Sequence, residues 1–162
     1  MGNIEFLREG EDYLVRTRVR LSHPIDRVFP FFAEPANLAR ITPPELGFII
    51  LTPSPITMAS GTRIDYTIRL WGLPLRWRTE ITRWDPPTEF EDTQTSGPYT
   101  KWVHRHQFKA DGDDTVMEDE VRYRLPFGIA GRLAHFVVRG QLRRIFTYRE
   151  ETIHRLLADL KS

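Results

Sequence analysis

The 162-residue sequence contains no cysteine. This absence excludes disulfide bonds, a thiol nucleophile and every metal site built on cysteine sulfur. It is typical of a protein from a reducing compartment, because disulfides form and persist where conditions are oxidising. We therefore expect a cytoplasmic protein.

The sequence also lacks an excess of charge and a long hydrophobic run. Its 23 basic and 22 acidic side chains give a net charge of +1, which offers no electrostatic reason to expect a nucleic-acid partner. No segment approaches the roughly 20 apolar residues of a membrane span, and the first residues, MGNIEFLREGEDY, lack the apolar core of a signal peptide. We expect no nucleic-acid partner and no stable membrane insertion, while the oligomeric state stays open.

Motifs of common catalytic machinery are missing as well. The ten glycines form neither GxGxxG nor a P-loop, so the sequence does not support a nucleotide cofactor. Neither GxSxG nor SxxK occurs, so no serine nucleophile is evident. We expect a protein that works without a cofactor.

Composition and patterning predict one domain over residues 1–162. A hydrophobic content of 40% and a charged content of 28% are those of a globular protein long enough for a sizeable core. Residues 13–21 alternate as in a half-buried strand, and two short helical segments follow, near Pro24 and Pro35. From residue 132 to about 160, apolar spacing without proline predicts one long helix, with Leu133, Phe136 and Val137 at the start of its apolar stripe and Arg149 on its polar face. Between these segments, period-two patterns predict six strands: 48–51, 61–71, 75–84, 90–95, 101–110 and 116–125.

This order of segments favours an α+β fold, because a run of antiparallel strands stands apart from the helices. We expect a curved antiparallel sheet of about seven strands around the long C-terminal helix. The two short helices after the first strand should close one end of the space between the sheet and the long helix.

Polar side chains share a face with large apolar ones in the strands 90–95 and 101–110. A period of two puts alternate residues on one side of a strand. The inner face of a sheet is normally apolar. A face that carries a carboxylate and imidazoles among aromatic rings therefore indicates one of two things. It lines a pocket, or it belongs to a core in which the polar groups hydrogen-bond to one another. The residues on these faces are Phe90, Asp92 and Gln94, and Trp102, His104, His106 and Phe108.

The turns between the strands suggest their register. Pairing across the turn SGPYT places Asp92 opposite His104, and pairing across DGDD places His106 opposite Asp119. Directly opposed side chains have Cβ atoms about 4.5–5.5 Å apart. The sequence thus predicts two Asp/His pairs on the concave side of the sheet, and a slip of two residues would exchange the partners but keep the face.

Three kinds of chemistry are open to these pairs. His104 and His106, with a carboxylate as a third ligand, are a candidate metal site; Asp92 and Asp119 are equally suited as hydrogen-bond partners, and we expect no metal. A histidine oriented by an aspartate can instead act as a general acid or base near neutral pH. In the third interpretation the pairs satisfy one another in the interior and orient a bound ligand.

Three stretches resemble a known superfamily. They are HPIDRVFPFFAEPANLARITPP at 23–44, GPYTKWVHRHQF at 97–108 and MEDEVRYRLPFG at 117–128. With the order of segments along nearly the whole chain, they resemble the START-like, or SRPBCC, superfamily, which includes polyketide cyclase/dehydrase-like proteins and has the helix-grip fold. The resemblance implies a deep, mostly apolar cavity between the sheet and the C-terminal helix. It supplies no catalytic residue.

We therefore expect the chain to bind a small hydrophobic molecule, lipid-like or aromatic and polyketide-like, in an internal cavity. The alternative is a cofactor-independent enzyme of the cyclase/dehydratase type, with Asp92, His104, His106 and Asp119 as general acids and bases. A third hypothesis is an interaction domain whose cavity is filled by side chains. The expected ligand-binding residues are Tyr66, Trp77, Gln94, Trp102, Tyr123 and Phe136, and the loop 52–60 and the segment 126–131 are candidate gates.

Overall fold

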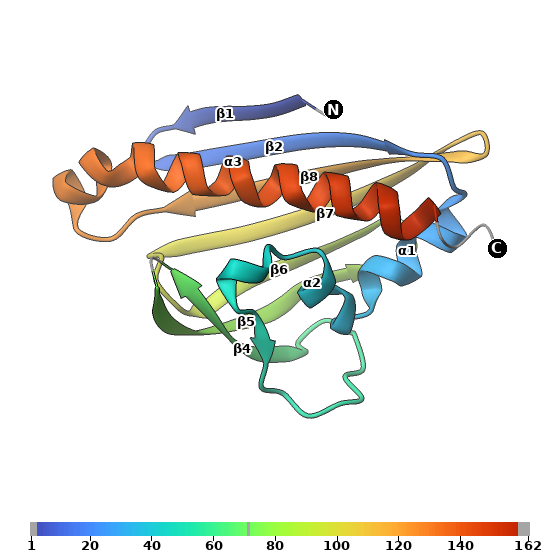
Figure 1. The fold of residues 1–162 in the computed structure, drawn as a ribbon, viewed down its shortest axis with the longest axis horizontal. Helices are drawn as coiled ribbons and strands as arrows, with labels where there is room; N and C mark the ends of the chain where they lie inside the picture. The colour runs from blue at the N-terminus through green and yellow to red at the C-terminus, as the bar shows by residue number, and fades with distance from the viewer. Residues whose placement is uncertain (1–2, 71, 159–162) are drawn as a thin grey trace.

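The computed structural model describes residues 3–70 and 72–158 (Figure 1). The strands form one eight-stranded sheet in the order β1-β2-β8-β7-β6-β5-β4-β3, and all neighbours are antiparallel. The strands are β1 (Asn3–Glu9), β2 (Asp12–Leu21), β3 (Ile49–Ile50), β4 (Arg63–Leu70), β5 (Leu73–Asp85), β6 (Glu89–Ser96), β7 (Lys101–Asp111) and β8 (Asp114–Arg124). The helices are α1 (Ile25–Ala33), α2 (Ala36–Arg40), the 3-10 helix η1 (Pro44–Leu46) and α3 (Gly128–Ala158).

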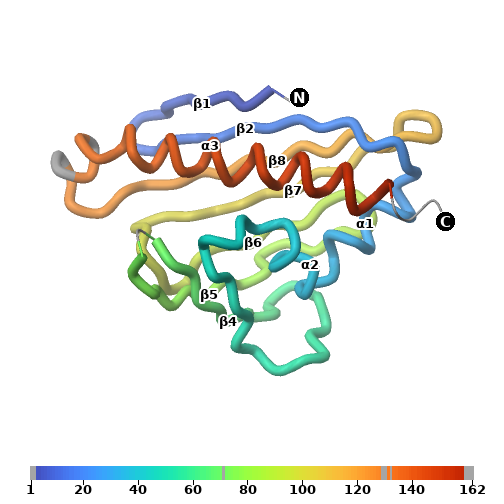
Figure 2. The backbone as a smooth tube through the Cα atoms, viewed as in Figure 1, coloured from blue at the N-terminus to red at the C-terminus, as the bar shows by residue number. Residues whose placement is uncertain are grey.

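The long helix α3 lies across one face of the curved sheet (Figure 1). Helix α1 lies at the end of the sheet where the last turns of α3 are found, and α2 follows it on the way to β3. The trace in Figure 2 shows the loop between β3 and β4 extending away from α3 at the bottom of the view. The arrangement is the predicted helix-grip fold of the α+β class.

The sheet has one strand more than the sequence analysis predicted. Strand β1 pairs with β2 along its whole length, from Asn3 opposite Arg18 to Glu9 opposite Asp12. Most of β1 is exposed, and only Ile4 and Phe6 pack partly against the core. Two half-buried side chains make a weak alternating pattern, so the N-terminal segment did not stand out as a strand.

An aromatic cluster fills the end of the sheet covered by α1. The ring of Phe29 lies 5.3 Å from that of Phe108, 5.6 Å from that of Trp84 and 6.1 Å from that of Phe90. Side chains from β5, β6 and β7 thus converge on one helical residue. This packing attaches α1 to the sheet and closes that end of the interior.

Helix α3 differs from its prediction at its start. The predicted apolar stripe began with Leu133, Phe136 and Val137, but all three are exposed, because at these turns the helix directs His135 and Val138 toward the sheet instead. Within the described ranges, no helix combines the length and apolar character needed to cross a membrane. The buried residues of α3 lie further along and include Val138, Leu142, Phe146, Ile153 and Leu157.

Candidate functional site

The register of the central strands matches the prediction. In the β6–β7 pair Asp92 lies opposite His104, and in the β7–β8 pair His106 lies opposite Asp119. Both imidazoles and Asp119 are buried. The alternation of these strands therefore turns all four side chains toward the inner face of the sheet.

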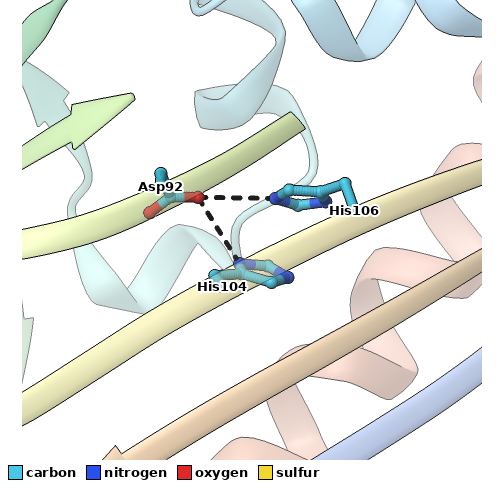
Figure 3. Close-up of side chains that lie close together, drawn as sticks. All are labelled: Asp92, His104 and His106. Carbon is cyan, nitrogen blue, oxygen red and sulfur yellow. Dashed lines mark ion pairs between the residues drawn. The ribbon is translucent and has the colours of Figure 1, made fainter. Parts of the chain in front are cut away.

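The four groups form one cluster rather than two separate pairs. His104 is 3.2 Å from Asp119 Oδ1 through Nε2 and 3.9 Å from Asp92 Oδ2 through Nδ1. His106 is 3.5 Å from Asp92 Oδ2 through Nε2 and 2.6 Å from Asp119 Oδ1 through Nδ1. Figure 3 shows Asp92 facing both imidazoles. Each imidazole thus bridges the two carboxylates, because diagonal neighbours on adjacent strands are also within reach.

The contacts of the cluster are not equivalent. His104 Nε2 and Asp119 Oδ1 form a hydrogen bond, whereas His106 Nδ1 approaches the same oxygen closely but outside hydrogen-bond geometry. Asp92 Oδ1 accepts a hydrogen bond of 2.9 Å from the Thr79 hydroxyl. Asp119 is therefore held by both imidazoles, and Asp92 is oriented by the neighbouring strand β5.

The pKa values of the two imidazoles move in opposite directions. Burial and the charge of His106 lower the pKa of His104 below its ordinary value of 6.5. Burial also acts to lower the pKa of His106, but the charge of Asp119 and contacts with both carboxylates outweigh it and raise that pKa above 6.5. The histidines likewise outweigh burial at Asp92 and Asp119 and hold the pKa values of both carboxyl groups below their usual range. His106 is therefore the more basic of the two imidazoles.

A cavity of about 170 Å³, partly open to the surface, adjoins this cluster. It lies between the strands β3 to β7 and the helices α1, α2 and α3, and its wall is mostly apolar. The polar side chains in the wall include Asp92, His104 and His106 from the sheet and Arg149 from α3. Its apolar lining includes Ile64, Tyr66, Trp77, Trp102, Leu142 and Phe146.

The residues predicted to bind a ligand occupy three different places. Tyr66, Trp77 and Trp102 line the cavity. Tyr123 is fully buried in the neighbouring core cluster, where its hydroxyl lies 3.0 Å from His135 Nε2. Gln94 folds back on its own turn, because its amide Nε2 donates a hydrogen bond of 2.7 Å to the carbonyl of Tyr99.

Phe136 was wrongly placed in the wall by the sequence prediction. Its side chain is 75% exposed. The prediction placed Phe136 on the inward side of the helix, but at this turn His135, whose ring stacks on that of Tyr13 at 3.6 Å, and the buried Val138 face the sheet instead.

Arg149 is a lining residue that the sequence analysis assigned to the polar face of the helix. It lies three residues after Phe146 and four before Ile153, which is the spacing of one helix face, and it is only 8% exposed. The signal was therefore present in the sequence: a charged residue occupies a position of the buried stripe.

Asp92, His104 and His106 are the described residues that could hold a metal ion. Their ligand atoms lie within 4.8 Å of one another, and two imidazoles with one carboxylate suit Zn²⁺ or Fe²⁺. The ion pairs within the cluster already provide partners for the same atoms.

We expect the purified protein to contain no stoichiometric transition metal, and inductively coupled plasma mass spectrometry would measure the metal content. One metal per chain in the wild type that is lost in His106→Ala would contradict this expectation.

The sheet wrapped around a long C-terminal helix places the chain in the helix-grip class. A START superfamily protein from Mycobacterium smegmatis has a TM-score of 0.67 at 14% identity, with 88% of this chain and 98% of that chain covered. A protein of Thermus thermophilus has a TM-score of 0.70 at 18% identity, covering 92% and 99%. A point mutant of norcoclaurine synthase from Thalictrum flavum, in complex with a transition-state analogue, has a TM-score of 0.68 at 13% identity, covering 99% and 100%.

The family itself is shown by sequence. The family model described as polyketide cyclase / dehydrase and lipid transport matches residues 21–146, so the chain belongs to this family. No curated protein matches the sequence significantly. Polyketide cyclase/dehydrase and START-like folds generally bind hydrophobic ligands.

Proposed function

We propose that the chain, as one domain over residues 1–162, binds a small, largely hydrophobic molecule in the cavity between the sheet and α3. The observation that carries this proposal is the wall of the cavity. Aromatic and aliphatic side chains such as Tyr66, Trp77 and Leu142 form most of it. An apolar wall supplies affinity, and a few polar groups fix the orientation of the ligand.

The size of the cavity limits the ligand. About 170 Å³ is close to the roughly 150 Å³ of an apolar cavity that takes up one benzene molecule. A ligand of one or two rings, or a short chain, therefore fits without a large movement of the walls. The loop 52–60 contributes Met58 to the lining, which supports the proposal that this loop is the gate.

Filling the cavity should abolish binding while the fold is retained. Ile145 lines the cavity from α3 and is only partly buried, so Ile145→Trp would place an indole ring in the space of the ligand. We expect naphthol to bind the wild type. Its affinity should fall at least about tenfold in Ile145→Trp, because the indole occupies the space of the ligand. A tenfold fall corresponds to a loss of about 1.4 kcal/mol of binding free energy. A fluorescence titration measures both dissociation constants.

The control carries the same substitution on the outer side of the helix. Val137 is exposed, so Val137→Trp should bind naphthol as the wild type does. Native mass spectrometry of the freshly purified protein would identify a co-purifying ligand. The proposal is wrong if naphthol and a set of similar compounds leave the wild type unchanged, or if Ile145→Trp binds them as tightly.

The Asp/His cluster supports a second candidate function, acid/base catalysis of the cyclase or dehydratase type. The observation in its favour is that His104 and His106 both line the cavity and have pKa values shifted in opposite directions. Groups whose environments push their pKa values apart are suited to act as an acid and a base at the same pH. Removing an imidazole should slow the conversion of a bound compound if the protein is an enzyme. It should change only affinity or specificity if the protein is a carrier.

A further inference from the structure

Arg149 brings a buried nitrogen without a hydrogen-bond partner to the wall of the cavity. Arg149 lies on the buried stripe of α3, lines the cavity and is 8% exposed. Its guanidinium carbon lies 5.4 Å from the centre of the Phe146 ring. The Nε end of the guanidinium is therefore held inside by packing, whereas most arginine side chains extend into solvent.

The Nε atom of Arg149 is buried and has no hydrogen-bond partner. Among the residues that the structure describes, no carboxylate lies within ion-pair distance, 4.0 Å, of this guanidinium, whereas Arg144 on the same helix pairs with Glu45 at 2.7 Å. A buried polar group without a partner costs free energy, and a buried charge costs more. A guanidinium whose buried Nε has no partner, in the wall of a ligand cavity, is accounted for when the ligand supplies that partner.

The charges around the cavity set the direction in which a ligand would lie. Burial raises the pKa of the Tyr66 hydroxyl, the charge of Asp92 raises it further, and the charge of Arg149 lowers it. Asp92 and Arg149 therefore act on the same region from the sheet side and from the helix side. A negatively charged group would be repelled by Asp92 and attracted by Arg149, so it would lie against α3.

We propose that Arg149 binds the carboxylate of the ligand, so that the cavity accepts a small hydrophobic carboxylic acid in its anionic form. This inference rests on the proposed ligand-binding function and names its ligand class. The planar fork of a guanidinium matches the two oxygens of a carboxylate. The apolar part of the acid then lies against Tyr66 and Trp77, which are stacked with ring centroids 5.8 Å apart.

Two probes of nearly the same shape separate charge from hydrophobic contact. Naphthoate carries a carboxylate, and naphthamide replaces it with a neutral amide. Dissociation constants for both are measured by calorimetry with the wild type, Arg149→Met and Arg149→Lys. Arg149→Met is expected to fold, because it replaces a guanidinium whose Nε is unpartnered by an apolar side chain of similar length, and chemical denaturation checks this.

The control variant is Arg143→Met, because Arg143 is exposed on the same helix and its guanidinium stacks over Phe6, in a different part of the molecule. We expect the wild type and Arg143→Met to bind naphthoate about tenfold to a hundredfold more tightly than naphthamide, the range of a hydrogen bond between charged groups. Arg149→Met should lose this preference, with naphthamide affinity changed by less than about threefold. Arg149→Lys should keep part of it.

The outcomes separate this inference from the proposed function. If the wild type binds naphthamide and naphthoate equally, or if Arg149→Met keeps the preference for naphthoate, Arg149 is not the carboxylate anchor, while ligand binding in the cavity stands. If the wild type binds neither compound, nor naphthol, the proposed function itself fails. Equal weakening of both compounds in Arg149→Met would show that the residue only shapes the cavity, and would overturn the inference.

Discussion

Replacing Asp119 by asparagine is expected to lower the free energy of unfolding by about 3 kcal/mol at about pH 6. Removing one partner of a buried ion pair leaves the other charge without compensation, which typically costs roughly 3–5 kcal/mol. Asp119 is the nearest carboxylate to His106, at 2.6 Å, and also accepts the hydrogen bond from His104. Urea denaturation followed by tryptophan fluorescence measures the loss.

The matched control is the neighbouring carboxylate on the outer face of β8. Glu118 pairs with Arg18 at 3.4 Å in an exposed position, and exposed pairs contribute at most about 1 kcal/mol. Glu118→Gln should therefore have little effect. A loss below about 1 kcal/mol in Asp119→Asn as well would contradict the view that the cluster is a coupled buried network.

The pH dependence of stability gives a second measure of the same variant. The pKa of His106 in the folded protein lies above 6.5. Its contribution to the free energy of unfolding is therefore complete below pH 6.5 and is lost as the pH rises through the folded pKa. The pKa of His104 in the folded protein lies below 6.5. Its contribution to the free energy of unfolding is therefore complete above pH 6.5 and is lost as the pH falls through the folded pKa. In Asp119→Asn the loss on the alkaline side should shrink, because His106 has lost its nearest carboxylate; NMR titration of the histidines would report this directly.

Replacing His104 or His106 by alanine is expected to separate the two proposed functions. General acid–base catalysis contributes about 10²- to 10⁴-fold to a rate. An enzyme would therefore lose turnover by that factor in either variant, while the affinity for the bound compound stays within a few-fold. A carrier would change only in affinity or specificity. The assay uses the compound that co-purifies with the protein and follows its conversion by mass spectrometry.

A side chain on the other face of β7 provides the control for these variants. The Gln107 amide donates a hydrogen bond of 3.0 Å to Glu89, away from the cavity. Gln107→Ala should leave both turnover and affinity unchanged. Full turnover in His104→Ala and in His106→Ala would exclude acid/base chemistry by this cluster.

The sequence was informative where local rules decide the structure. Short turns and a period of two fix which residues oppose each other, so the positions of Asp92 opposite His104 and His106 opposite Asp119 could be predicted before the structure was known. The same rules placed Tyr66, Trp77 and Trp102 on the inner face, where they line the cavity.

The parts that were not predicted depend on how elements are placed in space. The alternation on β7 gives a face but not the side-chain directions that bring each imidazole to both carboxylates. The exposure of Phe136 depends on how α3 is rotated about its axis over the sheet, which turns His135 and Val138 inward instead. Arg149 was assigned to the polar face because it is charged, although its spacing from Phe146 places it on the buried stripe. The extra strand β1 was missed because few of its side chains are buried.

Strand β1 also has a bearing on how copies of this chain meet one another. Its partner β2 contains the fully buried residues Leu14 and Val15, and an unpaired edge of that kind is a template for sheet-to-sheet aggregation. Strand β1 covers this edge and presents charged side chains such as Glu5, Arg8 and Glu9 in its place, while the opposite edge is the two-residue strand β3. Both borders of the sheet thus disfavour its continuation into the sheet of a second molecule.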